Sequence, residues 1–182
     1  VGYDLYCKLL NEAVKEEKGI APEHLFDTTV DLVVDAFIPN DYITSETQKM
    51  DLYKRIACIE TEEESEEMTE ELIDRFGDPP ASVLNLIRIA RLRASAHEVY
   101  LTEVSAKEKG ITFTFYERAK IDAVKIPEFL EKYDGNLVFR AGGEKPVLYY
   151  EEKNSRGKIT DTLSFCENFL KEMRQSLLER EN

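Results

Sequence analysis

The hydrophobic periodicity of the chain changes near Tyr100, and this change constrains the possible folds more than any other feature. Before Tyr100, apolar residues recur mostly every three to five positions, which places them on one side of an α-helix. After Tyr100, short segments such as Ile111–Tyr116 alternate apolar and polar residues, which predicts half-buried strands. The sequence therefore predicts an α+β fold in which a helical N-terminal half packs with a sheet-containing C-terminal half as one compact unit.

The first half is expected to contain four helices and one strand. The predicted elements are a helix over Tyr3–Lys18, a strand over Val30–Ile38, and helices over Ser45–Ile59, Thr61–Phe76 and Pro80–Glu98. Thr61 and Glu64 have the spacing of a capping box, and Gly77 is suited to end the helix that they begin.

The second half reads β-β-α-β-β-α, which favours an antiparallel sheet backed by helices. The predicted elements are strands over Tyr100–Val104, Ile111–Tyr116, Leu137–Ala141 and Val147–Tyr150, and helices over Ile126–Tyr133 and Thr162–Leu178. Gly110 and the Gly142-Gly143 pair are expected at hairpin turns. We expect residues 1–29 to be a helix and linker, and residues 30–182 to form a domain with a helical part (30–98) and an α/β part (99–182).

The charge of the chain is strongly negative and unevenly distributed. The 182 residues carry 37 acidic and 24 basic side chains, for a net charge of −13. Residues 1–98 contribute −12 of this and residues 99–182 contribute −1. Such a chain repels the phosphate backbone, so we expect no independent DNA binding and instead an acidic, partner-facing surface in the first half.

The sequence lacks the motifs of common enzymes. It contains no GxxxxGK[ST], GxGxxG, GxSxG or HExxH pattern, and neither His24 nor His97 has the neighbours that a metal site needs. The three cysteines, Cys7, Cys58 and Cys166, are far apart, which favours a reducing, cytoplasmic location without disulfides. The apolar runs are too short to span a membrane. We therefore expect no catalysis, cofactor or metal in this chain.

Residues 60–74 contain nine acidic side chains and no basic one. Their simplest interpretation is a solvated helix face. Like charges four residues apart cost about 0.2–0.5 kcal/mol per pair in an isolated helix, however, and a basic partner would recover that cost. Both interpretations stay open at this point. The candidate partner-binding residues are Glu67, Glu70, Glu71 and Asp74.

Glu71 and Asp74 border the apolar stripe of this helix, where a carboxylate is well placed for a bidentate contact with an arginine across an interface. Arg88, Arg91 and Arg93 form the basic cluster of the first half. We expect these arginines to pair with the preceding acidic helix rather than with phosphate groups.

Five ordered segments together resemble the C-terminal region of the bacterial transcription-repair coupling factor family. They are Val1–Tyr6 (VGYDLY), Ala36–Ile43 (AFIPNDYI), Leu52–Ala57 (LYKRIA), Glu71–Gly77 (ELIDRFG) and Ile89–Arg93 (IARLR). The resemblance covers essentially the whole chain. It is specific in residues 1–93, whereas beyond residue 100 only the strand-helix pattern and the terminal helix match.

This resemblance implies a function. The parent would be a superfamily 2 ATPase that binds stalled RNA polymerase, translocates on duplex DNA and recruits the damage-recognition protein UvrA, with its ATP and Mg sites in upstream motor domains. Residues 1–29 would leave the last motor domain. The remainder would be a regulatory domain that masks the parent's N-terminal UvrA-binding region through an acidic contact, with Glu71 and Asp74 as the positions carried over.

Two alternatives remain. The chain could be a stand-alone interaction module whose acidic half binds a basic partner in trans. It could also be a small enzyme with an unrecognised site, for which the only support is the Tyr and Glu content of the second half.

Overall fold

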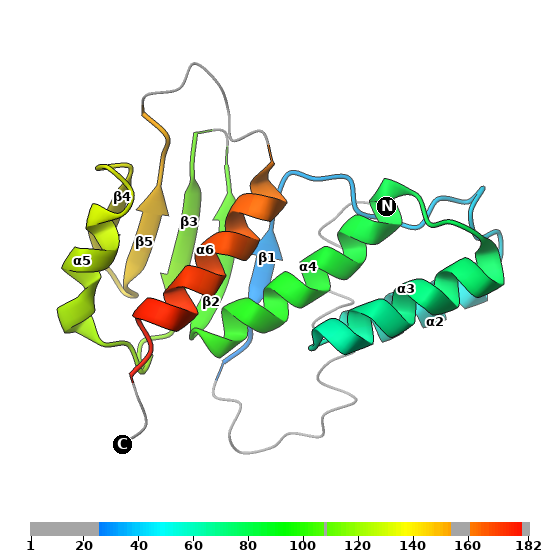
Figure 1. Cartoon of the computed structure of the whole chain (residues 1–182), viewed down its shortest axis with the longest axis horizontal. Coiled ribbons are helices and arrows are strands. Elements are labelled where there is room, and N and C mark those ends of the chain that lie inside the picture. The colour runs from blue at the N-terminus through cyan, green and yellow to red at the C-terminus, as the bar shows by residue number, and fades with distance from the viewer. Residues whose placement is uncertain (1–25, 108, 154–160, 180–182) are drawn as a thin grey trace. The chain divides into compact units, whose positions relative to one another are not determined.

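A computed structural model describes residues 26–107, 109–153 and 161–179 of the chain (Figure 1). Helices precede a mixed sheet whose strands alternate with further helices, so the predicted α+β class is confirmed. The predicted helix over Tyr3–Lys18, together with Cys7 and His24, lies outside the described residues and stays a prediction.

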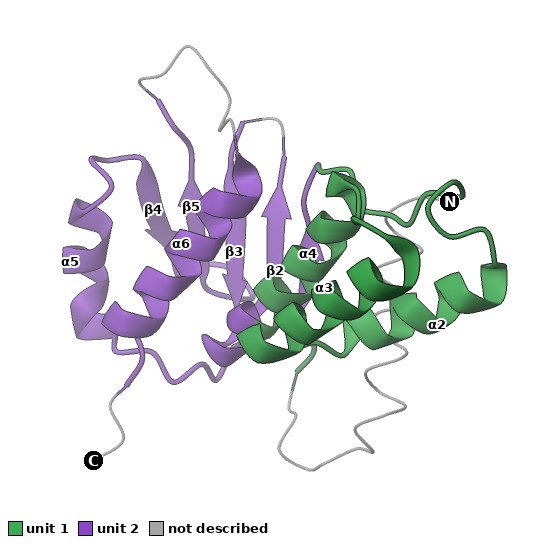
Figure 2. Cartoon of the chain, turned by 45° about the vertical axis from the view of Figure 1, so that its right-hand side comes forward, with its two compact units in different colours: residues 1–27, 34–94 green, residues 28–33, 95–182 purple. Residues whose placement is uncertain are grey.

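The described residues belong to two compact units (Figure 2). The helical unit contains residues 26–27 and 34–94, and the sheet unit contains residues 28–33 and the described residues from 95 onward. This division differs from the predicted boundary between residues 98 and 99 in two ways. A short N-terminal segment belongs to the sheet unit, and one helix contributes residues to both units.

Three helices form the helical unit, and their starts follow from local capping. They are α2 (Glu46–Ala57), α3 (Glu62–Phe76) and the part of α4 (Ala81–Glu98) that ends at Ala94. The Thr61 hydroxyl accepts a hydrogen bond from the Glu64 N–H at 3.2 Å, and the Glu64 carboxylate accepts one from the Thr61 N–H at 3.1 Å. The predicted capping box of α3 is therefore confirmed.

Gly77 ends α3, as predicted, because its backbone adopts a φ of +84° that residues with a Cβ rarely adopt. The Gly77 N–H donates to the Ile73 carbonyl oxygen at 3.0 Å, and the Tyr42 hydroxyl donates to the Gly77 carbonyl oxygen at 2.8 Å. Pro80 directly precedes α4, and its carbonyl oxygen accepts the first hydrogen bonds of that helix, from Val83 and Leu84.

The predicted strand over Val30–Ile38 is wrong beyond Asp31. The observed strand β1 covers only Thr29–Asp31, although burial continues to alternate as far as Ile38. The reason is that β1 has a partner strand for three residues only. Further along, the extended backbone bonds to helical residues instead: the Phe37 N–H donates to the Ser82 carbonyl oxygen at 3.2 Å, and the Ile38 N–H donates to the Tyr53 hydroxyl at 2.8 Å.

The sheet unit contains a five-stranded mixed sheet with the order β1-β2-β3-β5-β4. Its other strands are β2 (Leu101–Ala106), β3 (Ile111–Phe115), β4 (Leu137–Arg140) and β5 (Val147–Tyr150). These four strands pair antiparallel, as predicted, whereas β1 adds a parallel edge beside β2. The β-β-α-β-β-α order of the second half is confirmed.

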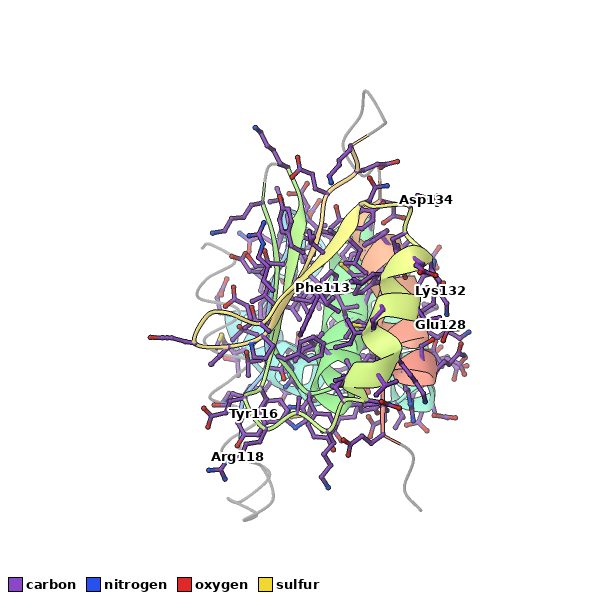
Figure 3. The ribbon with its side chains drawn as sticks, turned by 90° about the vertical axis from the view of Figure 1, so that its left-hand side faces the viewer. Phe113, Tyr116, Arg118, Glu128, Lys132 and Asp134 are labelled. Carbon is purple, nitrogen blue, oxygen red and sulfur yellow. The ribbon has the colours of Figure 1, made fainter. Side chains whose placement is uncertain are left out.

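Helices α5 (Ile126–Glu131) and α6 (Thr162–Ser176) lie on the same face of this sheet (Figures 1 and 3). Phe113 of β3 lies between the sheet and these helices (Figure 3), and its ring stacks on that of Phe169 with a centroid distance of 4.3 Å. Phe129 packs against Phe169 in an edge arrangement at 5.6 Å. The core of the sheet unit is therefore aromatic and lies on the helix-covered face.

Two glycines of the hairpin loops should respond oppositely to alanine. A Cβ at Gly110 would overlap the Tyr150 carbonyl oxygen and lie 2.7 Å from the Tyr149 hydroxyl oxygen, whereas a Cβ at Gly142 would meet no atom within 4 Å. We expect Gly110→Ala to lower the free energy of unfolding by about 1–3 kcal/mol, since two paired strands must shift. Gly142→Ala, the matched control, should be neutral or raise it by up to about 1 kcal/mol. Urea denaturation measures both, and equal effects would contradict the close approach at Gly110.

Candidate functional site

Helix α3 places the predicted acidic residues on one solvent-exposed stripe. Its buried side contains Ser65, Met68 and Leu72. Residues spaced by three and four positions share a helix face, and on the opposite side this spacing brings together four exposed acids. We call these residues the acidic stripe: Glu63, Glu67, Glu70 and Asp74. Within the described part of the chain, none of the four carboxylates makes a hydrogen bond or ion pair.

Glu71, the fourth predicted partner-binding residue, has a different environment. Its carboxylate accepts a hydrogen bond from Arg55 Nη1 at 2.7 Å and a second, parallel one from Arg55 Nη2, so the pair is bidentate. Arg75, one turn later in α3, donates to the same carboxylate at 2.8 Å. The arginine contact expected for this residue is therefore made inside the helical unit, where it joins α3 to α2.

The two arginines hold the pKa of Glu71 at about 2, below its ordinary value of 4.5, and the hydrogen bonds from Arg55 are the larger cause. Glu71 is therefore ionised at any physiological pH. One carboxylate is shared by two guanidinium groups, so this cluster has a surplus positive charge beside the acidic stripe. Arg55 and Arg75 were not predicted as site residues. Arg75 has a local signal, since it lies four residues after Glu71, but Arg55 lies sixteen residues before Glu71 on another helix.

The opposite flank of the acidic stripe faces α4. Arg91 of α4 forms an ion pair with Glu62 at 3.6 Å and also donates to the Glu60 carbonyl oxygen. Arg93 donates to the Ala57 carbonyl oxygen, the last residue of α2, at 3.0 Å. The predicted internal pairing is thus seen for Arg91, whereas Arg93 bonds to a helix terminus.

The described residues of the sheet unit show no comparable candidate site. Burial raises the pKa of the Cys166 thiol to about 12, which makes it unreactive, and burial with a hydrogen bond to Glu172 raises the pKa of Tyr133. The Thr28 hydroxyl donates to the Leu101 carbonyl oxygen at 2.6 Å, and His97 Nδ1 lies 3.0 Å from that hydroxyl, so His97 helps to fix the start of β1.

No group of three or more His, Cys, Asp or Glu side chains among the described residues is placed to hold a metal ion. None of the described helices is both long enough and apolar enough to cross a membrane.

Neutralising Glu71 should destabilise the fold in a pH-dependent way. Its lowered pKa means that the ionised carboxylate stabilises the folded state above pH 4.5, and that this contribution is lost as the pH falls toward about 2. Because its partner arginines are 41% exposed, we expect Glu71→Gln to cost only about 1 kcal/mol at neutral pH. Urea denaturation between pH 7 and pH 2 should show the difference from wild type disappearing.

Glu67→Gln is the matched control, since Glu67 lies on the same helix without a partner in the described chain. It should leave stability unchanged or raise it by up to about 0.5 kcal/mol, because it relieves repulsion along the stripe. Equal destabilisation by both variants, or a pH-independent loss for Glu71→Gln, would show that the ion pairs are energetically unimportant.

Comparison with known proteins identifies the family. The family model of the TRCF domain matches residues 32–126. The transcription-repair-coupling factor of Bacillus subtilis is 32% identical over 182 residues, which cover 98% of this chain and 16% of that protein. The corresponding protein of Staphylococcus epidermidis is 38% identical over 124 residues, which cover 67% of this chain and 11% of that protein. The chain thus spans less than a fifth of the length of these relatives.

A solved structure described as the crystal structure of the C-terminal domain of transcription-repair coupling factor has the same fold. It superposes with a TM-score of 0.61 and 24% sequence identity, and the match covers 85% of this chain and 98% of that one. The chain therefore belongs to the transcription-repair coupling factor family, and its fold is that of the family's C-terminal domain.

Proposed function

We propose that this chain is the non-catalytic regulatory domain of a DNA translocase that acts in transcription-coupled nucleotide-excision repair. In this proposal it masks the UvrA-binding region of its parent protein through an acidic contact. The observation that carries the proposal is the acidic stripe of α3, which presents four carboxylates to solvent without a partner in the described chain.

The energetics of the stripe support a basic partner. Glu63, Glu67 and Glu70 repel one another along the helix, as do Glu70 and Asp74, at about 0.2–0.5 kcal/mol for each pair one turn apart. Arginine or lysine side chains brought against the stripe would convert this repulsion into attraction. Contacts of this kind contribute specificity and fast association more than affinity, which suits a mask that has to be removed.

The geometry assigns different roles to the two residues carried over from the family resemblance. Asp74 is exposed and has no described partner, so we propose that it contacts the UvrA-binding region directly, together with Glu67 and Glu70. Glu71 is already bound by Arg55 and Arg75. We propose that Glu71 acts as a positioning residue that fixes α3 against α2.

A regulatory contact of this kind is necessarily modest in strength. A closed state favoured by about 3 kcal/mol keeps more than 99% of molecules masked, and a similar free energy supplied elsewhere opens them. In this proposal ATP and Mg act in the parent's motor domains, which also contact DNA. UvrA and RNA polymerase are partners of the parent, and the direct partner of this domain is the parent's own N-terminal region.

Reversing the charge of the stripe in the full-length protein should expose the UvrA-binding region. We expect the triple variant Glu67→Lys, Glu70→Lys, Asp74→Lys to bind UvrA about tenfold more tightly at low salt, since three attractive contacts become repulsive. A binding titration with purified UvrA at low and high salt measures this. The matched control is Glu128→Lys, Glu131→Lys, Glu144→Lys, which reverses three exposed acids of the sheet unit.

Unchanged UvrA affinity in a folded triple variant would contradict the masking proposal. If the stripe serves a basic partner in trans instead, the variant would lose that partner in pull-down experiments while its UvrA affinity stays at the wild-type value.

A further inference from the structure

We propose that Ile73 of α3 and Leu84 of α4 form the apolar centre of the surface that the UvrA-binding region occupies. The occupant is a basic segment that places one aliphatic or aromatic side chain between arginines or lysines. This inference rests on the function proposed above and specifies the chemistry of its partner.

Helix geometry places Ile73 and Leu84 on facing sides of α3 and α4. The ion pair between Glu62 and Arg91 joins the start of α3 to the later part of α4, so the two helices run antiparallel from the turn at Gly77–Pro80. Ile73 follows Glu62 by about three turns, and Leu84 precedes Arg91 by about two turns. Each residue therefore lies within about 20° of the face that carries the ion pair.

The two residues are also level along the helices, because Ile73 lies four residues before Gly77 and Leu84 four residues after Pro80. They are 43% and 38% exposed, respectively. A single exposed aliphatic side chain needs no explanation, but two on facing sides of neighbouring helices form a patch. Both are large enough to act as anchors for an apolar side chain of a partner.

The surroundings of this pair determine the charge of its partner. Glu70 and Asp74 of the acidic stripe lie within one turn of Ile73, and Asp78 lies in the turn that follows; all three are exposed. Arg88 lies one turn after Leu84, but it already interacts within the chain. An apolar centre with a rim of carboxylates is complementary to an apolar side chain flanked by basic ones, which is the usual composition of a centre and rim in protein interfaces.

The centre and the rim make separable contributions. Attraction between exposed charges is screened by salt, whereas burial of apolar surface is not weakened by it. A mask held only by charge would release UvrA-binding capacity as salt rises. A mask with an apolar anchor would keep a salt-resistant component, and removal of Ile73 and Leu84 should abolish that component.

The test uses the full-length protein and UvrA affinity at low and high salt. We expect Ile73→Ala, Leu84→Ala to bind UvrA about fivefold more tightly than wild type at both salt concentrations, as truncation of an interface anchor typically does. The charge-reversed triple variant should instead show a gain that shrinks as salt rises. Val124→Ala, which truncates an 87% exposed apolar residue of the sheet unit, is the control and should match wild type.

A second variant guards against a loss of structure. Ile73→Met, Leu84→Met keeps apolar side chains of similar volume, and it should retain wild-type masking with an unchanged thermal midpoint. If the alanine variant behaves like Val124→Ala while the charge-reversed variant gains affinity, the apolar anchor is wrong and the masking function stands. If neither variant gains affinity, both proposals fall.

Discussion

The bidentate ion pair between Arg55 and Glu71 determines how the acidic run of α3 can be used. It joins α2 to α3 and, with Arg75, removes one carboxylate from the solvent-facing set. It also fixes which side of α3 is turned outward, because the residues opposite Leu72 must then face solvent. The remaining unpaired acids form one stripe rather than a diffuse cloud of charge, and a partner can recognise a stripe by its spacing.

Local signals predicted the elements whose energetics are local. Thr61 and Glu64 satisfy each other's backbone N–H groups within a single turn, so their spacing alone was sufficient to place the start of α3. The strand over Val30–Ile38 failed because strand formation depends on a partner far away in sequence. The apolar alternation was a correct signal of burial, but the sheet offers β1 only three paired residues, and the chain then enters the helical unit.

The same distinction applies to the candidate site. The exposure of Glu67, Glu70 and Asp74 follows from helical spacing, which any acidic amphipathic helix shows. The engagement of Glu71 by Arg55 required knowledge of which helix lies beside α3, and nothing in the intervening residues specifies that. Gly110 is similar: a hairpin turn predicted a glycine there, but the constraint is the close approach of Tyr149 and Tyr150 from a strand almost forty residues later.

A mask that must open during each cycle is limited in how it can be held. Charge alone would make the closed state sensitive to ionic strength, and a large apolar interface would close it too tightly to be reversed. A small apolar centre surrounded by unpaired carboxylates avoids both limits, since the rim provides orientation and the centre provides a short-range, salt-resistant contribution. The burial of Glu71 between two arginines fits this division, because a carboxylate so strongly engaged would exchange partners slowly, whereas Asp74 can gain and lose a basic partner without first breaking an internal bond.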